Sequence, residues 1–525
     1  MPATFLLACL LAALAPGCSG DKSAGARDEA RPAIGRVIVL GFDGLEPTTV
    51  RKWVAEGNLP NFKRLMDEGA FGDLVSVLPP ASAPAWVSAV TGVNPGKHGI
   101  YGFVVSGLPG YETQGKDGVG ASPVFSTSAH RGFDAVWDGI GRYGRRSVVI
   151  NVPLTCPADS INGLMVAGFP HTSADTATYC WPRNLAERLG DYRFDAFAAT
   201  CGKGQEAQFI ADLESTSAAR LRLGQTLFDE GGWDLFWLVF TFTDRCQHHL
   251  WKYMDRNHPM YDAVGGSLYG LEIEKAYRRA DDYLGVFLGR MQDSDLLVVM
   301  SDHGFGPVYH IMNSQNFLFR ALGATPEVMC FDFFSGLFKI SATGPGAEDK
   351  YASLRARLVK ELGGLEDPER GGAVIDSVYL KEQIYTGPYV GQAPDVVCKE
   401  KPGYLFFTLS RTPDLRLFDA GPSPDRMFSG YHVRRGTLGL FGKHVRAGLA
   451  LDARIVDVAP MVYAYLGVPA PAQVDGRVPA AFRDDVAGEM ILDRASASGF
   501  RVPRGDDQQD SKRIEKQLRS VGYIQ

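Results

Sequence analysis

Two short segments of the chain place a carboxylate beside an imidazole at spacings that suit a metal ion. In "TDRCQHHLW", Asp244 and His248 are four residues apart, so both face one side if the segment is helical, and His249 faces elsewhere. In "SDHGFG", Asp302 and His303 are adjacent, and the glycines that follow allow the turn by which both reach one ion. Taken alone, the first segment fits a solvated loop with a capping aspartate equally well, and the second fits a β-turn.

Two further oxygen and nitrogen donors stand apart from these segments. Asp43 lies in "GFDG" after an apolar run, and His432 lies in "SGYH" just before another. A single aspartate after a strand is commonly a turn former or helix cap, and a single histidine is more often structural than a ligand. Donors of this kind without thiolates suit Zn²⁺, with Mn²⁺ as the alternative. Two such ions about 4 Å apart can hold the attacking and leaving oxygens of a phosphoryl displacement.

The segment "PPASAPAWVSAVTG", residues 79–92, holds the candidate nucleophiles Ser82 and Ser88. A serine hydroxyl is a weak nucleophile, and coordination to a metal can lower its pKa and supply the alkoxide. Ser82 precedes Pro84, which favours the start of a helix, where free N–H groups and the helix dipole attract an anion. Ser88 is six residues further on, where we expect it inside that helix, without a catalytic role.

Alternating strands and helices must position these residues. Four apolar runs rich in β-branched residues predict buried strands: "RVIVLGFDG" (36–44), "RRSVVINVP" (145–153), "WDLFWLVFTFTD" (233–244) and "SDLLVVMSDHG" (294–304). Helical spacing occurs between them, as in residues 272–291, in residues 47–70 with a break at Gly57–Pro60, and in residues 454–471, where we expect a helix from near Asp457 to Gly467. This alternation predicts an α/β fold with a mostly parallel central sheet flanked by helices.

Three of the carboxylates follow predicted strands, and this is the main reason to group them. The carboxyl ends of parallel strands lie at one edge of a sheet, where ligands collect. Asp43, Asp244 and Asp302 each stand at such an end. We therefore expect them to converge on one rim, with inserted cap regions above it.

Length, composition and charge limit the remaining choices. The chain of 525 residues is long enough for a large catalytic core with insertions. Its net charge of −6 argues against a nucleic-acid binder, which usually carries an excess of basic residues. No nucleic acid polymer is expected as a partner.

The N-terminus predicts export. "TFLLACLLAALAPGC" (residues 4–18) is uncharged and apolar but shorter than the roughly 20 residues that span a bilayer. It is typical of a signal peptide, and "LAPGC" is similar to a lipobox in which Cys18 would be lipidated. Residues 1–4 lack Lys and Arg and Leu14 stands one place early for a lipobox, so an ordinary cleavable signal is the alternative. We expect an exported protein on the periplasmic or cell-surface side, anchored to a membrane by its lipid.

The predicted organisation has four parts. They are a signal peptide with the candidate lipobox (1–18), a flexible tether (19–34), a catalytic domain (35–480) with insertions at about 104–225 and 307–430, and a charged tail (481–525). Eight cysteines are present and none forms a Cys-x-x-Cys pair, which argues against a thiolate zinc site. Export permits disulfides, for example between Cys180 and Cys201 or Cys156, but the spacing does not determine a pairing.

The order of these motifs resembles that of the alkaline phosphatase superfamily. The resemblance is closest to the type I phosphodiesterase/nucleotide pyrophosphatase family, and within it to the predicted phosphohydrolase/phosphomutase group. It rests on "GFDG", "PPASAPAWVSAVTGVNPGKHGI", "TDRCQHH", "SDHG" and "GYH", and on "DVAPMVYAYLGVPAPAQVDGR" near the end, so it spans residues 36–477. It implies two divalent metal ions and a phosphoseryl intermediate.

The resemblance also implies a role for each motif residue. One metal would be held by Asp43, Asp302 and His303, with Ser82 bridging toward it as the nucleophile. The other metal would be held by the second set of three ligands, Asp244, His248 and His432.

Two departures from related patterns narrow the reaction. Nucleotide pyrophosphatases and related monoesterases carry an asparagine soon after "HGI" that holds a phosphate oxygen, whereas this chain has Phe103. Neither a nucleotide nor a monoester substrate is therefore implied, and the substrate-binding residues stay unknown; Lys97, Arg131, Arg434 and Arg435 are candidates for anion contacts. Sulfatases mature a serine or cysteine that has arginine four residues later, a position that Trp86 occupies here, so we expect Ser82 to remain serine.

Together these observations predict a two-metal phosphoric ester hydrolase, a phosphodiesterase or phosphomonoesterase. Its substrate would be a small-molecule or lipid-headgroup phosphate ester. The first alternative is a phosphotransferase or phosphomutase on the same site. The second is a non-catalytic metal-binding lipoprotein, against which the presence of Ser82 argues.

Overall fold

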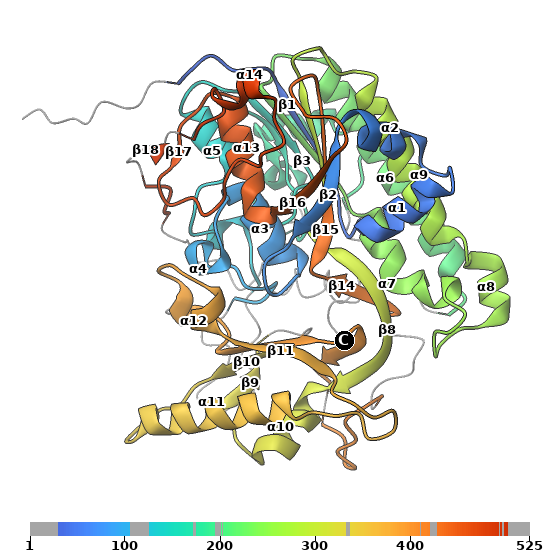
Figure 1. Cartoon of the computed structure of the whole chain (residues 1–525), viewed down its shortest axis with the longest axis vertical. Coiled ribbons are helices and arrows are strands. Elements are labelled where there is room, and N and C mark those ends of the chain that lie inside the picture. Colours follow the sequence, from blue (N-terminus) through green and yellow to red (C-terminus); the bar gives the residue numbers. More distant parts are fainter. Residues whose placement is uncertain are drawn as a thin grey trace, which may run out of the picture.

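A nine-stranded sheet forms the centre of the molecule in this computed structural model (Figure 1). The structure describes residues 30–105, 125–171, 175–194, 201, 203–331, 336–409, 411–419, 428–492, 494–495 and 498–501. In sheet order the strands are β16 (Leu449–Arg454), β2 (Ala70–Val75), β15 (Arg435–Phe441), β7 (Leu296–Met300), β1 (Val37–Phe42), β6 (Leu235–Phe240), β3 (Ser147–Ile150), β4 (Gly163–Val166) and β5 (Cys180–Trp181).

The inner strands of this sheet are parallel. β7, β1, β6, β3 and β4 run in one direction, whereas β15 is antiparallel to β7 and to β2, and β5 is antiparallel to β4. The predicted α/β fold with a mostly parallel central sheet flanked by helices is confirmed.

Both faces of the sheet are buried, which explains the continuous apolar runs of its strands. Along β1, Val37 and Val39 enter one core, and Ile38 and Leu40 enter the other. The first core is covered by α3 (Ser82–Thr91), α5 (Val136–Gly141) and α13 (Val458–Tyr465). The second is covered by α1 (Pro47–Ala55), α2 (Pro60–Glu68), α6 (Glu206–Asp229), α7 (Phe242–Met254) and α9 (Glu272–Leu288).

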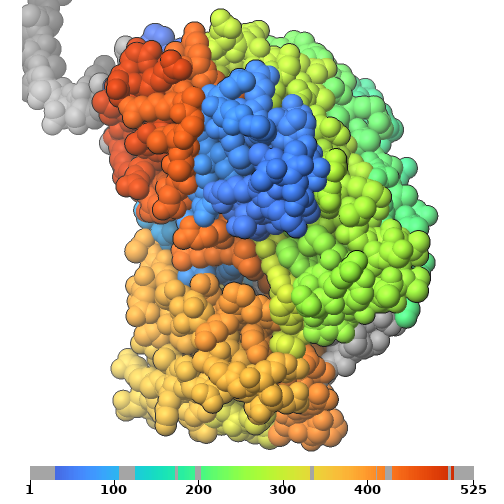
Figure 2. Space-filling view, turned by 45° about the vertical axis from the view of Figure 1, so that its right-hand side comes forward, coloured from blue at the N-terminus to red at the C-terminus, as the bar shows by residue number. Residues whose placement is uncertain are grey.

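A second, smaller mass lies beneath this body, and we call the described residues between 307 and 419 the lobe. Figure 2 shows it in yellow and orange below the body. Its strands β9 (Val328–Cys330), β10 (Leu337–Ile340), β11 (Ile375–Leu380) and β12 (Val396–Glu400) form a sheet in the order β11-β12-β10-β9. The apolar faces of α10 (Ser314–Leu322) and α11 (Ala347–Gly363) share a core with that sheet. The short helix α12 (Lys381–Ile384) follows β11 directly.

One long strand connects body and lobe. β8 (Gly304–Asn313) begins where β7 ends, and it pairs with β13 (Gly403–Phe407) in the lobe and with β14 (Gly430–Val433) at the rim of the body. Figure 1 shows β8 curving from one mass to the other. The remaining elements are α4 (Pro95–His98), α8 (Ala263–Tyr269), α14 (Asp484–Ala487), β17 (Ala470–Pro471) and β18 (Arg494–Ala495).

The predicted signal peptide, Cys18 and most of the tether lie outside the described residues. Within the described part of the chain, helices long and apolar enough to cross a bilayer are absent. The six cysteines that the structure describes form no disulfide with one another, so the pairs that export would permit are not made here.

Candidate active site

The carboxyl ends of three neighbouring strands bring the candidate ligands to one rim. Asp43 follows β1, Asp244 lies in the first turn of α7 after β6, and Asp302 follows β7. Because β6, β1 and β7 are adjacent in the sheet, the three carboxylates meet. All three are at most 3% exposed.

His303 lies at the centre of the first group of donors. Its Nε2 is 3.4 Å from Asp43 Oδ1 and 3.2 Å from Asp302 Oδ2. One donor atom from each of these three residues lies within 4.8 Å of the others, a spacing that fits a single ion.

His432 lies at the centre of the second group. Its Nε2 is 3.1 Å from Asp244 Oδ1 and 3.0 Å from His248 Nε2, and His248 Nε2 is 3.3 Å from the same Asp244 oxygen. His303 also lies within ligating distance of Asp244 and His432, and its ring stacks on that of His432 with centroids 3.6 Å apart. The two groups therefore adjoin.

Backbone carbonyls orient all three histidines. Nδ1 of His248 lies 3.0 Å from the Gly430 carbonyl oxygen, Nδ1 of His303 lies 3.1 Å from that of Gly304, and Nδ1 of His432 lies 3.1 Å from that of Pro80. A carbonyl can only accept, so the proton sits on Nδ1 and the lone pair of Nε2 faces the cluster. This arrangement is typical of histidines that bind a metal.

The donor set fits a cation better than it fits an empty polar core. The Nε2 lone pairs of His248 and His432 face each other at 3.0 Å, an arrangement that repels unless a positive ion or proton lies between them. Oδ1 of Asp43 and Oδ2 of Asp302 are buried and accept no hydrogen bond within the described part of the chain. Buried polar groups are normally satisfied, so these atoms point to a missing ligand.

The charges of the site support the same conclusion. Burial, and then the charges of Asp302 and Asp244, raise the pKa of Asp43 well above its usual range. Burial also raises the pKa of Asp302 to about 8. Burial alone would raise the pKa of Asp244, but His248 and His432 outweigh it and hold that pKa well below its usual range. Without a cation, then, the three carboxylates are not all ionised at neutral pH.

The pKa values of two histidines, His303 and His432, shift in the opposite direction to those of Asp43 and Asp302. Burial, and then the charge of His432, lower the pKa of His303 well below its usual range. Burial lowers the pKa of His432 to about 4. Both rings are therefore neutral at pH 7, which is the form that binds a metal.

Ser82 lies at the edge of this cluster. It is the first residue of α3 and only 4% exposed, and its Oγ is 3.2 Å from Nε2 of His303. Because α3 begins there, its unpaired N–H groups and the positive end of its dipole lie beside the hydroxyl. The structure thus brings together Ser82 and the six predicted ligands.

Ser88 is in a different environment, inside α3. Its Oγ is 2.9 Å from Nε2 of His98. Nδ1 of His98 accepts a hydrogen bond from the Ile100 N–H, so the proton is on Nε2, which donates to the serine. His98 therefore cannot act as a base toward Ser88, and the pair is a buried structural contact.

Trp86 has a role that the sequence did not predict. Its Nε1 donates a hydrogen bond to Asp43 Oδ2 at 3.2 Å, and its ring lies against the backbone at Gly41, where an added Cβ would come within 2.5 Å of it. Trp86 is one turn beyond Ser82 on α3, so one helix positions both the nucleophile and a ligand of the cluster. An indole ring offers one hydrogen-bond donor, its N–H, and no acceptor. In the sequence, the one feature that pointed to this contact was the spacing of four residues between Ser82 and Trp86.

Apolar side chains border the site on one side. Phe428 stacks on His248 with centroids 4.1 Å apart. Phe103 packs edge-to-face on Phe169 with ring centroids 5.8 Å apart, and both belong to a buried cluster that includes Ala83, the residue after Ser82. Apolar side chains therefore pack next to the start of α3.

The four basic residues considered for anion contacts hold other positions. Lys97 forms an ion pair with Asp475, Arg131 with Asp159, and Arg435 with Asp73. Arg434 donates from Nε to the Ser76 carbonyl and lies beside a separate cavity.

Comparison with known families gives one match. A sequence model of the family described as type I phosphodiesterase / nucleotide pyrophosphatase matches residues 37–425, which include Ser82 and every candidate metal ligand but His432. No curated protein sequence matches the chain.

Solved structures share the fold at low identity. Phosphonoacetate hydrolase from Sinorhizobium meliloti 1021, in complex with phosphonoformate, is 16% identical, with a TM-score of 0.54, and the match covers 84% of this chain and 99% of that one. Murine ectonucleotide pyrophosphatase / phosphodiesterase 5 is 14% identical, with a TM-score of 0.50 over 87% of this chain and 100% of that one. These likenesses concern the fold.

Proposed function

The chain belongs to the type I phosphodiesterase / nucleotide pyrophosphatase family, and from this premise we propose that it is a two-metal phosphoric ester hydrolase that acts through Ser82. One observation carries the proposal: a buried serine hydroxyl lies 3.2 Å from an imidazole that also contacts two carboxylates with unsatisfied oxygens. A purely structural metal site would not need a hydroxyl at this position.

The first group of donors would hold one ion, and the second would hold another. Asp43, Asp302 and His303 form the first set, with Ser82 beside it. Asp244, His248 and His432 form the second. Oxygen and imidazole ligands suit Zn²⁺, with Mn²⁺ as the alternative. When bound, such ions would supply Lewis-acid stabilisation of the serine alkoxide and of the charge on the phosphoryl oxygens.

Ser82 makes the first bond of the reaction. Its hydroxyl gives its proton to solvent water, its Oγ attacks phosphorus, and the bond from phosphorus to the ester oxygen breaks, so the alcohol leaves and takes a proton from water. The N-terminus of α3 faces the negative charge that collects on the phosphoryl group. A water molecule then attacks the phosphoserine, releases the phosphate product and restores the serine.

The packing behind the nucleophile indicates the kind of ester. Ala83, the residue directly after Ser82, belongs to a buried apolar cluster that includes Phe103 and Phe169. An alcohol group that packs against such a cluster would be aryl or alkyl rather than charged. We infer that the substrate is a small-molecule or lipid-headgroup phosphate ester with an apolar alcohol portion.

The apolar leader supports a location outside the cytoplasm. With Cys18 lipidated, the tether would hold the body near a membrane surface on the periplasmic or cell-surface side. Replacement of Cys18 by serine should then release the protein from the membrane fraction of the producing bacterium without loss of activity.

The nucleophile is tested by Ser82→Ala. The variant should lose hydrolysis of an aryl phosphate by at least 1,000-fold, because the residual rate depends on binding and electrostatics alone, and it should keep its metal content. Ser88→Ala is the matched control, since it removes a hydroxyl from the same helix and should keep wild-type turnover. Wild-type rates in Ser82→Ala would contradict the mechanism.

The reaction class is tested with a panel of esters. Metal-analysed protein should hydrolyse an aryl phosphomonoester or phosphodiester, and an aryl sulfate should not be hydrolysed. Products are analysed with and without an added alcohol acceptor. Transfer to the acceptor in preference to water would show a phosphotransferase, and full metal content without turnover of any ester would exclude both enzymes.

A further inference from the structure

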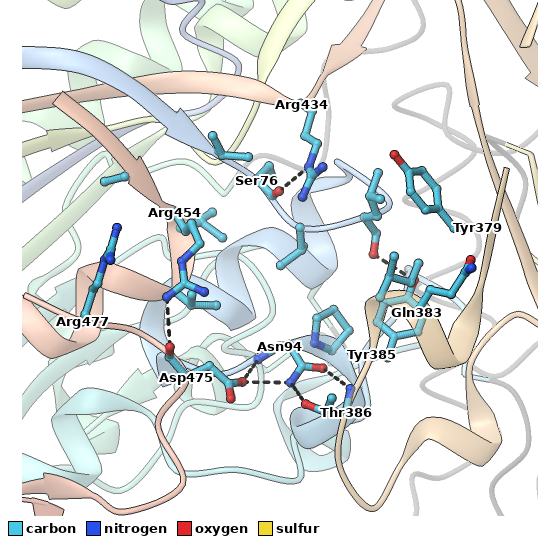
Figure 3. Close-up of a pocket in the computed structure, with 18 of the residues that line it drawn as sticks. Ser76, Asn94, Tyr379, Gln383, Tyr385, Thr386, Arg434, Arg454, Asp475 and Arg477 are labelled. Carbon is cyan, nitrogen blue, oxygen red and sulfur yellow. Dashed lines mark hydrogen bonds between the residues drawn. The ribbon is translucent and has the colours of Figure 1, made fainter. Parts of the chain in front are cut away.

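A second cavity lies between the body and the lobe, behind the segment that leads to Ser82 (Figure 3). Its volume is about 690 Å³, which is within the range of roughly 300–1,000 Å³ that small-molecule sites occupy. Figure 3 shows Arg454 and Arg477 on one side, Tyr379 and Gln383 from the lobe on the other, and Arg434 between them. None of these residues belongs to the candidate active site.

Arg434 is the main cation of this cavity. Its Nε is occupied by the Ser76 carbonyl at 2.9 Å, and this single bond fixes the guanidinium. The hydrogen bonds and ion pairs of the described residues use neither of its two Nη groups, which are therefore available to a ligand. Arg477 lines the same cavity and likewise uses only its backbone N–H, which donates to Asp457.

The carboxylates nearby are largely neutralised by other cations. Asp475 accepts from Lys97 in an ion pair and also binds the side chain of Asn94. Arg454 pairs with Asp457 at 3.1 Å. Asp452 is the remaining acid of the lining, and it is exposed. Arg434 and Arg477 are thus opposed by Asp452 alone, and the lining keeps a net positive charge.

Polar groups without partners lie at the same wall. Ser76 is 2% exposed, and its Oγ has no hydrogen-bond partner within the described part of the chain. Buried hydroxyls are normally bonded, so this one indicates a partner that is not part of the protein. The hydroxyl of Tyr379 faces the cavity from the lobe and can add a further donor.

We propose that this cavity binds a small anion of the phosphate class through Arg434 and Arg477, with Tyr379 donating from the lobe. Guanidinium groups suit phosphate because their paired N–H donors match two of its oxygens. The volume exceeds that of inorganic phosphate, so the site also accommodates an organic phosphate.

The site is connected to the nucleophile through alternate carbonyls of one segment. The carbonyls of Ser76, Leu78 and Pro80 accept from Arg434 Nε, Tyr385 OH and His432 Nδ1. Arg434 and Tyr385 line the cavity, and Ser82 follows two residues after the last carbonyl. An anion that holds Arg434 in place therefore also holds the segment that positions the nucleophile.

Equilibrium binding tests the proposal without turnover, so its failure is distinct from failure of the proposed hydrolase. Inorganic phosphate is titrated by calorimetry into the full chain after treatment with a chelator, which removes metal-dependent binding at the active site. We expect one phosphate per chain. Absence of binding would overturn the proposal. A second titration uses ribose 5-phosphate: tighter binding than that of phosphate identifies an organic phosphate as the ligand, and the reverse identifies the free ion.

Three variants locate the site. Arg477→Gln and Arg434→Gln should each weaken binding by about tenfold or more, and Tyr379→Phe by a smaller factor. Arg435→Gln is the control, because Arg435 is adjacent in sequence but pairs with Asp73 outside the cavity. Arg477→Gln keeps the test valid if Arg434→Gln does not fold, since the hydrogen bond of Arg477 within the described residues runs to Asp457 and not to the segment. Equal affinity in Arg477→Gln and Arg435→Gln would contradict the assignment.

Hydrogen exchange tests the link to the nucleophile. Phosphate should slow amide exchange in residues 76–81 of the wild type at least threefold and leave it unchanged in Arg477→Gln. Binding of phosphate that leaves exchange in this segment unchanged would refute the connection.

Discussion

At the scale of single residues, the histidines carry the argument for a metal site. A histidine whose Nδ1 donates to a carbonyl has one free lone pair, and here three such lone pairs share one buried space with three carboxylates. His98, a structural histidine, differs at both nitrogens: its Nδ1 accepts a hydrogen bond from the Ile100 N–H, and its Nε2 donates to the Ser88 hydroxyl. Its ring therefore has no lone pair left for a metal.

Trp86→Phe tests the contact that holds Asp43. The change removes the indole donor, so Asp43 can rotate, and metal affinity should fall about tenfold. Affinity is measured by competition with a chromophoric chelator. Trp237→Phe is the control: Trp237 is equally buried, and its Nε1 has no hydrogen-bond partner within the described residues, so it should lose stability but not affinity. Equal affinities in both variants would contradict the role of Trp86.

The buried carboxylates predict how stability depends on pH. The pKa of Asp302 is raised to about 8 in the folded, metal-free chain and is near 4 in the unfolded chain. A raised pKa contributes stability that is lost as pH rises through the folded value. The lowered histidine pKa values act in the opposite direction, but only below about 6.5, where the unfolded histidines gain protons.

Between pH 6.5 and 8, chelator-treated protein should therefore lose unfolding free energy as pH rises, by at most about 1.4 kcal/mol per pH unit for each carboxyl. Metal-loaded protein should not, because a cation favours the ionised carboxylates. Urea denaturation across this range measures both forms, and Asp302→Asn should reduce the slope of the treated protein. A parallel pH dependence in the loaded and treated forms would contradict the assignment.

The residue scale also shows what the sequence could predict about the site. Ser82 and five of the candidate ligands stood out because each lies beside a predicted strand end, a glycine or a proline, and His248 stood out by its spacing of four residues from Asp244. Trp86 did not, because a tryptophan inside a helix is usually a core residue and its single donor finds its acceptor only after the fold forms. Phe428 follows a stretch outside the described residues, and nothing in its spacing indicated that it stacks on His248.

At the scale of elements, the turn after β1 allows the least change of residue type. Gly44 has φ +71°, and a Cβ there would lie 2.9 Å from the ring of Phe305 and 3.1 Å from the Asp244 backbone. Its N–H donates to Asp302 Oδ1 at 3.3 Å. The loop after β1 can thus approach α7 and the end of β7 only with glycine at this position.

Gly44→Ala should therefore cost more than backbone strain alone. Gly57 is the control, because it has φ +80° with no atom within 4 Å of an added Cβ, so Gly57→Ala should cost about 1 kcal/mol. Gly44→Ala should cost about 2–4 kcal/mol and weaken metal binding, as its clashes displace Phe305 or Asp244. Chemical denaturation measures both variants. Similar losses in the two would show that the loop can move away without damage to the site.

The sequence predicted the elements of the body better than those of the lobe. The strands of the inner sheet are buried on both faces, so each is a continuous apolar run, and the break at Gly57–Pro60 separates α1 from α2 because Pro60 can start a helix but not continue one. In the lobe, only two side chains of α11, Leu358 and Leu362, are fully buried, and most residues of β11 are partly exposed. Such weak apolar patterns, among many glycines and prolines, resemble loops until the tertiary contacts are known.

At the scale of the whole molecule, body and lobe meet at the segment that precedes the nucleophile. Tyr385 from the lobe donates to the Leu78 carbonyl, at 2.8 Å and in a buried setting. Its ring packs edge-to-face on Tyr101 of the body. His432 donates from Nδ1 to the Pro80 carbonyl at the end of the same segment. It reaches this position because β14 pairs with β8, the strand that enters the lobe. The lobe therefore helps to hold the segment that leads to the site.

Tyr385→Phe measures this support. The variant keeps the ring and loses only the hydroxyl, so the lobe should stay folded while the segment before Ser82 gains freedom. A nucleophile displaced by about 1 Å reduces the rate of the chemical step, so kcat for an aryl phosphate should fall at least fivefold, with KM and metal content little changed. The control is Tyr351→Phe, which removes a hydroxyl bonded to Asp395 within the lobe and should lower stability without altering kcat. If the two variants lose kcat equally, general loosening of the lobe explains the effect; if neither does, the body alone positions Ser82.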